Sequence, residues 1–161
     1  MSNVEIYKSM HLSEHFTLGE VCKTNHKTAD GNIPSRVAIE NLKNICENWL
    51  EDLRYSNNVL YEEVGSDGAP IIITSGYRSP EVNKLAGGSS TSNHLTGCAV
   101  DIRCIGVEQA LRYANILLDI ADGTKRDFDE LFIERNKQGR YWIHFAVRPK
   151  ENRRKISFLQ T

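Results

Sequence analysis

The sequence is short of several features that would assign it to a particular class of protein. It has no run of about eighteen apolar residues, so no segment is long enough to span a bilayer as a helix. Lysine and arginine total 20 against 21 aspartate and glutamate, and the formal net charge of −1 gives the whole molecule no electrostatic basis for binding nucleic acid. There is no internal repeat, and 161 residues suit one domain with a single core.

A secretory signal is also missing from the first ten residues, which lack a basic stretch followed by an apolar one. We therefore expect synthesis in the cytoplasm without a signal peptide, and release or export by another route if the target lies outside. The four cysteines form no Cys-x-x-Cys pair, and a domain of this size does not need a disulfide framework. We expect all four to be reduced packing residues: Cys22, Cys46, Cys98 and Cys104.

The order of helical and strand patterns is typical of a single α+β domain with a small antiparallel sheet. We expect an irregular N-terminal segment, 1–34, with one helical turn, and a basic, solvated C-terminal tail, 148–161. Apolar periodicity predicts helices over residues 35–54, 80–85 and 106–120, with a polar loop over 55–70. Strands are predicted over residues 70–75, 98–102, 128–134 and 141–147, the last two joined as a hairpin.

Three residues of this pattern could bind a metal ion. His94 lies in a small polar loop, Asp101 ends an alternating run after Gly97, and His144 interrupts an otherwise apolar strand. Two imidazoles and one carboxylate would leave a zinc ion one position open for water, which is the arrangement of a hydrolase. The spacing alone leaves two interpretations open: a metal site, or an unrelated loop histidine, capping aspartate and core histidine.

The residues around these three form motifs of a known family. The run Ser92-x-His94-x-x-Gly97-x-Ala99-x-Asp101, then Trp142-Ile143-His144, with Ser75-Gly76-Tyr77-Arg78-Ser79 upstream, resembles the M15 peptidases, the zinc D-Ala-D-Ala carboxypeptidase family. The resemblance covers roughly residues 70–147 and is closest to short bacterial and bacteriophage members that cut cell-wall peptides. It implies a fold of the hedgehog/D,D-peptidase type, in which helices flank a small antiparallel sheet that carries the metal site.

The resemblance also implies roles for individual residues. It implies a zinc ion with three protein ligands: His94, Asp101 and His144. Glu134 would be the general base, taking a proton from water and passing it to the leaving amine. Arg78 would neutralise charge on the tetrahedral intermediate or hold the substrate's carboxylate. Tyr77, Ser92 and Trp142 would shape the substrate pocket.

One departure from the family concerns the base. Many relatives carry an acidic residue two or three positions before the last histidine, whereas Tyr141 and Trp142 stand there in this chain. Directly opposed residues of an antiparallel hairpin share a face, so Glu134 joins His144 only if it opposes an even-numbered residue such as Trp142. A plain six-residue loop would pair it with Tyr141 and turn its carboxylate away. We therefore expect a different register, or a bulge.

The expected function is zinc-dependent hydrolysis of a peptide bond in peptidoglycan stem peptides, of the D-Ala-D-Ala carboxypeptidase type, by a monomer that does not bind nucleic acid. Two alternatives remain. One is an L-Ala-D-Glu endopeptidase, as in phage lysins of this family. The other is a non-catalytic zinc-stabilised binding module, because the related hedgehog domains bind zinc yet act as ligands. The presence of both Arg78 and Glu134 favours an enzyme, since a structural zinc needs neither.

Overall fold

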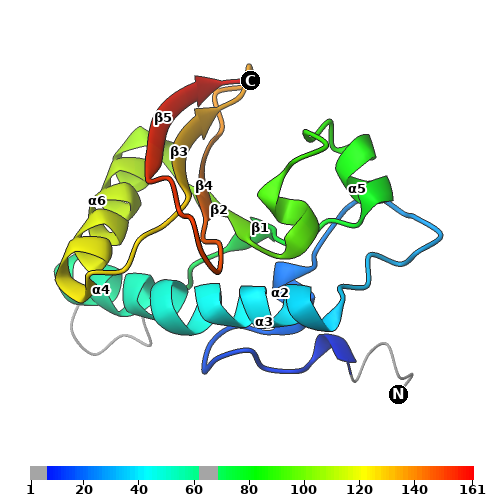
Figure 1. Ribbon diagram of the computed structural model, residues 1–161. Coiled ribbons are helices and arrows are strands. Elements are labelled where there is room, and N and C mark those ends of the chain that lie inside the picture. The colour runs from blue at the N-terminus through cyan, green and yellow to red at the C-terminus, as the bar shows by residue number, and fades with distance from the viewer. Residues whose placement is uncertain (1–6, 62–68) are drawn as a thin grey trace.

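A computed structural model describes residues 7–61 and 69–161 of the chain. Five strands form one sheet in the order β1-β2-β4-β3-β5, and helices pack around it, as expected for an α+β fold of the hedgehog/D,D-peptidase type (Figure 1). The strands are β1 (Ile73–Ser75), β2 (Ala99–Cys104), β3 (Glu130–Arg135), β4 (Tyr141–Ala146) and β5 (Lys155–Gln160). The helices are α2 (Leu18–Val21), α3 (Arg36–Ile45), the π-helix η1 (Cys46–Leu50), α4 (Glu51–Tyr61), α5 (Pro80–Leu85), the 3₁₀ helix η2 (Asn93–Thr96) and α6 (Gly106–Thr124).

The C-terminal tail is exposed along most of its length, as predicted, but it also forms a strand of the sheet. Strand β5 runs parallel to β3, whereas the other neighbouring strands are antiparallel. The basic residues of the tail make ion pairs while remaining exposed: Arg153 with Asp129 at 2.7 Å and Arg154 with Asp122 at 2.7 Å. These contacts hold the chain beside β3, and the alternating run that follows the basic residues then pairs with that strand.

The long helix begins where the sequence predicts and ends later. Ser35 caps it, since its hydroxyl oxygen accepts a hydrogen bond from the backbone N–H of Ala38 at 3.2 Å. The helix continues through η1 and α4 to Tyr61, beyond the predicted end at residue 54, because residues 55–61 include no glycine or proline to stop it. The rest of the loop predicted over 55–70 includes residues 62–68, which lie outside the described residues.

The wide turn η1 lies in the middle of this helix. The backbone N–H of Glu51 donates to the carbonyl of Cys46, five residues earlier, which is the hydrogen bond that defines a π-helix. Trp49 of this turn is buried and packs edge-on against Phe128 and at a tilt against Phe145, with ring centroids 6.3 and 5.0 Å away. Burial of each large apolar side chain of this kind contributes about 1.5–3 kcal/mol.

Helices cover one face of the sheet and leave the other to the metal-ligand residues. Figure 1 shows α6 along one side of the sheet, the long α3–α4 helix across its lower end, and the segment with α5 and η2 on the opposite side from α6. Helix α6 extends beyond the predicted end at residue 120 and ends at Thr124, before Lys125 in the left-handed conformation. Strand β1 has three of the six residues predicted for it.

The described helices include none long and apolar enough to cross a membrane. All four cysteines are free, and three of them are buried, which confirms the prediction of reduced packing residues. The N-terminal segment joins the same core, since three of its side chains are almost fully buried: Phe16, Leu18 and Val21.

Candidate metal centre

Three elements bring the predicted metal ligands together. Asp101 on β2 lies directly opposite His144 on β4, and His94 comes from η2, which precedes β2. The Oδ1 atom of Asp101 is 3.2 Å from Nδ1 of His144 and 3.4 Å from Nε2 of His94. All three residues are buried, and their ligand atoms lie within 4.8 Å of one another. The structure thus assembles the whole predicted ligand set in one place.

The spacing of these atoms fits a zinc ion. Zinc binds nitrogen and oxygen ligands at about 2.0–2.2 Å in a tetrahedral arrangement, which puts ligand atoms about 3.4 Å apart. The observed separations of 3.2 and 3.4 Å agree with that value. A buried set of two imidazoles and one carboxylate with this spacing favours the metal interpretation over three unrelated residues.

His94 is positioned by the close packing of its 3₁₀ turn on helix α3. The turn begins at Ser92, whose hydroxyl accepts a hydrogen bond from the backbone N–H of His94 at 3.2 Å. It ends at Gly97, whose φ of 71° lies in the left-handed region. A Cβ at this position would lie 2.4 Å from the carbonyl oxygen of Ala38 on α3, so the approach requires a glycine.

Two of the three ligands have their second polar atom held by a neighbour. Nδ1 of His94 lies 2.6 Å from the carbonyl oxygen of Gly76, just after β1. Oδ2 of Asp101 accepts a hydrogen bond from Nη2 of Arg78 at 3.1 Å, and Nε of the same guanidinium donates to Ser75 at 2.9 Å. Such outer contacts orient metal ligands, and here they point Nε2 of His94 and Oδ1 of Asp101 toward each other.

The third ligand is held by a residue that the sequence analysis did not single out. Nε2 of His144 lies 2.8 Å from Oε2 of Glu130, on the far side of the ring from Asp101. Glu130 lies on β3 four residues before Glu134, so alternation along the strand puts both on the face of His144. The alternation of side chains along β3 can be read from the sequence, but the pairing of β3 with β4 cannot.

Asp101 and His144 both favour their charged forms within this group. Burial alone would raise the pKa of Asp101, but the neighbouring His94 and His144 outweigh it and hold that pKa far below its usual range. Burial alone would lower the pKa of His144, but hydrogen bonds to Asp101 and Glu130 outweigh it and raise the pKa to about 9. Asp101 is therefore ready to act as a ligand, while His144 must lose a proton before it can bind a metal.

The hairpin register puts Glu134 on the face of the metal ligands. Arg135 pairs with Tyr141, so residues 136–140 form a five-residue connection and Glu134 lies opposite Trp142. This confirms the prediction that the pairing departs from the plain six-residue loop. The indole Nε1 of Trp142 donates a hydrogen bond to Oε2 of Glu134 at 2.5 Å. Burial and the negative charge of Asp101 raise the pKa of Glu134, which suits a proton acceptor.

The remaining predicted residues lie around this group, and their roles stay predictions. The Arg78 side chain is 16% exposed and forms its ion pair with Asp101. Tyr77 is 8% exposed and belongs to the core cluster, so it offers little surface to a substrate. Ser92 caps the turn of His94, and Trp142 contacts Glu134, so each is placed to fix another residue of the site.

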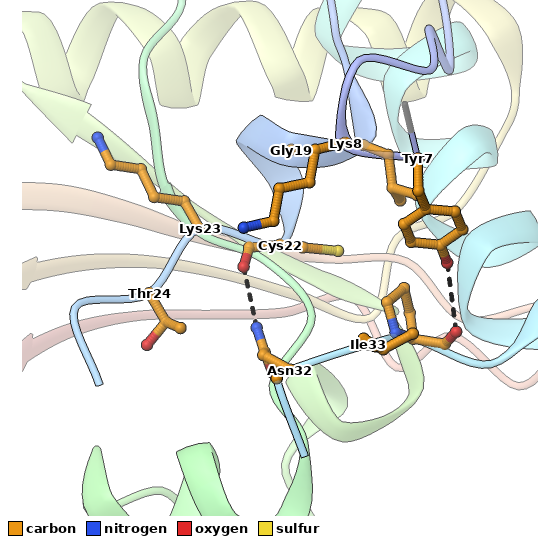
Figure 2. Close-up of a pocket in the computed structure, with 11 residues that line it drawn as sticks. Tyr7, Lys8, Gly19, Cys22, Lys23, Thr24, Asn32 and Ile33 are labelled. Atoms are coloured by element: carbon orange, nitrogen blue, oxygen red, sulfur yellow. Dashed lines mark hydrogen bonds between the residues drawn. The ribbon is translucent and has the colours of Figure 1, made fainter. Parts of the chain in front are cut away.

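A separate cavity lies in the N-terminal segment, beside α2 (Figure 2). It has a volume of about 400 Å³ and includes none of the predicted site residues in its lining. The amide nitrogen of Asn32, in its wall, donates to the carbonyl oxygens of Cys22 and Tyr77 at 2.9 and 3.2 Å. Oδ1 of Asn32 accepts from the backbone N–H of Ser79 at 2.7 Å. These hydrogen bonds connect the cavity wall to the loop that carries Arg78.

Comparison with known proteins bears on this site. The protein-family model described as Peptidase M15 matches residues 14–119, about two thirds of the chain. The match contains Arg78, His94 and Asp101, and it ends before the β3–β4 hairpin that supplies Glu134 and His144. The curated proteins gave no match. The family match and the His-Asp-His group agree with each other, and the chain belongs to the M15 family of peptidases.

Proposed function

We propose that the protein is a zinc metallopeptidase that hydrolyses a peptide bond in peptidoglycan stem peptides, of the D-Ala-D-Ala carboxypeptidase type. The observation that carries this proposal is the placement of Glu134 on the same sheet face as the His94-Asp101-His144 group. A metal that only stabilises a binding module does not need a partly buried carboxylate of raised pKa beside it.

Each residue of the site has a separate role in hydrolysis. His94, Asp101 and His144 would hold the zinc ion, which would polarise the scissile carbonyl and make a water molecule more acidic. Glu134 accepts the proton of the attacking water and passes it to the leaving amine, while the indole of Trp142 holds its carboxylate in place. The guanidinium of Arg78 supplies positive charge toward the tetrahedral intermediate or toward a carboxylate of the substrate.

Because the proposed substrate lies in the cell wall, the protein reaches it after release or export, and we propose that it acts as a monomer. The scissile bond distinguishes two peptidases of the family. A carboxypeptidase releases free D-alanine from stem peptides that end in D-Ala-D-Ala. An L-Ala-D-Glu endopeptidase instead separates the stem peptide from the rest of the wall.

Digestion of purified peptidoglycan, with mass analysis of the products, tests the proposal. We expect free D-alanine from the zinc-loaded protein, its loss on addition of a chelator, and its return with added zinc. His94→Ala and His144→Ala proteins should bind no zinc and release no product. Stem peptides cut after L-alanine would establish the endopeptidase instead. A fully zinc-loaded protein that yields no product would favour the binding module.

A further inference from the structure

The side chain of Glu130 lies between a metal ligand and the C-terminal segment. Its Oε2 atom is 2.8 Å from Nε2 of His144, and its side chain is 16% exposed. Its other oxygen, Oε1, accepts a hydrogen bond from Nη2 of Arg153 at 2.9 Å. The amide of Asn93, the residue before His94, donates to Oε2 at 3.1 Å. Both oxygens of Glu130 are therefore held from two directions.

A second carboxylate strengthens this arrangement. Asp129 is completely buried and accepts hydrogen bonds from the same two donors: Nδ2 of Asn93 at 2.8 Å, and Nε and Nη2 of Arg153 at 2.9 and 2.7 Å. The backbone N–H of Arg153 also donates to Asp129 at 3.1 Å. Asn93 and Arg153 thus bind the Asp129-Glu130 pair as a unit, and Glu130 has little freedom to leave His144.

The partner of each imidazole decides which ring nitrogen is available to a metal. A carbonyl oxygen can only accept, so Gly76 requires a proton on Nδ1 of His94 and leaves the lone pair on Nε2. Glu130 is an acceptor beside Nε2 of His144. It therefore requires a proton on Nε2 and leaves the lone pair on Nδ1. The two freed nitrogens are the ones that face Oδ1 of Asp101.

We propose that Glu130, braced by Asn93 and Arg153, is the positioning residue that fixes His144 as its Nε2–H tautomer and directs metal binding to Nδ1. This inference rests on the proposed metal function of the site. Carboxylate partners of metal-binding histidines typically change metal affinity by about 10–100-fold when they are removed. Because Arg153 holds Glu130, metal affinity should also depend on the segment that precedes β5.

Zinc affinity, measured by competition with a chromophoric chelator, tests the inference without any peptidase assay. Relative to the unaltered protein, we expect an affinity about 10–100-fold lower for Glu130→Ala. Glu130→Gln should lose less, because its amide oxygen can still accept from Nε2–H. Arg153→Gln should also weaken binding. The control is Glu108→Gln, which removes the same charge from the exposed Glu108–Arg112 pair on α6 and should leave the affinity unchanged.

Nitrogen-15 NMR of the zinc-loaded protein gives a second readout that a purely structural role would not move. We expect Nδ1 of His144 to show the shift of a metal-bound nitrogen, and Nε2 to carry a proton protected from exchange with water. Glu130→Gln should retain that proton, with faster exchange. Zinc bound through Nε2, or an affinity of Glu130→Ala equal to that of the control, would overturn the inference. If Glu130→Ala does not fold, the NMR spectra of the unaltered protein and of Glu130→Gln decide.

These measurements also separate this inference from the proposed function. A protein that binds zinc through the braced His144 but does not cut peptidoglycan would refute the peptidase and leave the inference intact. A protein that cuts peptidoglycan while Glu130→Ala binds zinc as tightly as the unaltered protein would refute the inference alone.

Discussion

Replacement of Gly76 by alanine should damage both the fold and the metal centre. A Cβ at residue 76 would lie 2.1 Å from the carbonyl oxygen of Val21 and 2.9 Å from its carbonyl carbon. Both are backbone atoms of the last residue of α2, so no side chain can rotate to make room. The same carbonyl accepts a hydrogen bond from the backbone N–H of Tyr77 at 2.7 Å, and separating the two segments would break it. Overpacking costs about 1–3 kcal/mol and the lost hydrogen bond about 1 kcal/mol, so we expect about 2–4 kcal/mol in the free energy of unfolding.

Urea unfolding of the metal-free proteins measures this effect, and Gly123→Ala is the matched control. Gly123 lies within helix α6 with open space around its Cβ position, so alanine there should stabilise the protein by about 0.5–1 kcal/mol. Because the carbonyl of Gly76 holds His94, zinc affinity should fall in Gly76→Ala and not in Gly123→Ala. A Gly76→Ala protein within about 0.5 kcal/mol of the unaltered one would refute the steric argument.

Three further predictions concern carboxylates and the arginine of the site. Glu134→Gln should retain its fold and zinc but lose about 10²–10⁴-fold in hydrolysis, measured as product release at saturating zinc; retained turnover would exclude Glu134 as the base. Arg78→Ala should lose about 2–4 kcal/mol of transition-state stabilisation in kcat/KM, and an unchanged kcat/KM would leave Arg78 only its contact with Asp101. Burial alone would raise the pKa of Asp129, but hydrogen bonds from Arg153 and Asn93 lower it to about 2. This depressed pKa stabilises the fold above the unfolded pKa of about 3.9, on the order of 2 kcal/mol or less after solvent screening of Arg153, and the contribution disappears as the pH falls through about 2. Urea midpoints followed across this range should fall less in Asp129→Asn than in the unaltered protein.

Local signals in the sequence were sufficient for much of the fold. Ser35 marks the start of the long helix through its capping hydroxyl, and residues 128–134 and 141–147 alternate as a hairpin does. The three metal ligands could be found because a histidine within an apolar strand and an aspartate after a glycine bend are uncommon, and a family motif connects them. These features depend on a few neighbouring residues, which a sequence shows directly.

Features that depend on distant pairings could not be predicted in this way. Glu130 lies in a stretch with Asp127 and Asp129 that reads as the polar start of a strand, and its contact with His144 follows from the register of β3 and β4. The parallel pairing of β5 was hidden by the basic residues before it, whose acidic partners lie more than twenty residues away. Gly76 likewise lies against the backbone of Val21, a close approach between distant segments that the sequence does not reveal.

The wide turn η1 sets the rotational phase between the two halves of the long helix. Each residue of an α-helix advances about 100° around the axis, so loss of one residue from Cys46–Leu50 would restore regular hydrogen bonding and turn α4 by that angle relative to α3. Leu53, now buried, would leave the core while Leu42 remained in it. Backbone hydrogen bonding therefore favours the shorter helix and side-chain packing favours the longer one. A single-residue deletion here would be costly although the local helix it creates is more regular.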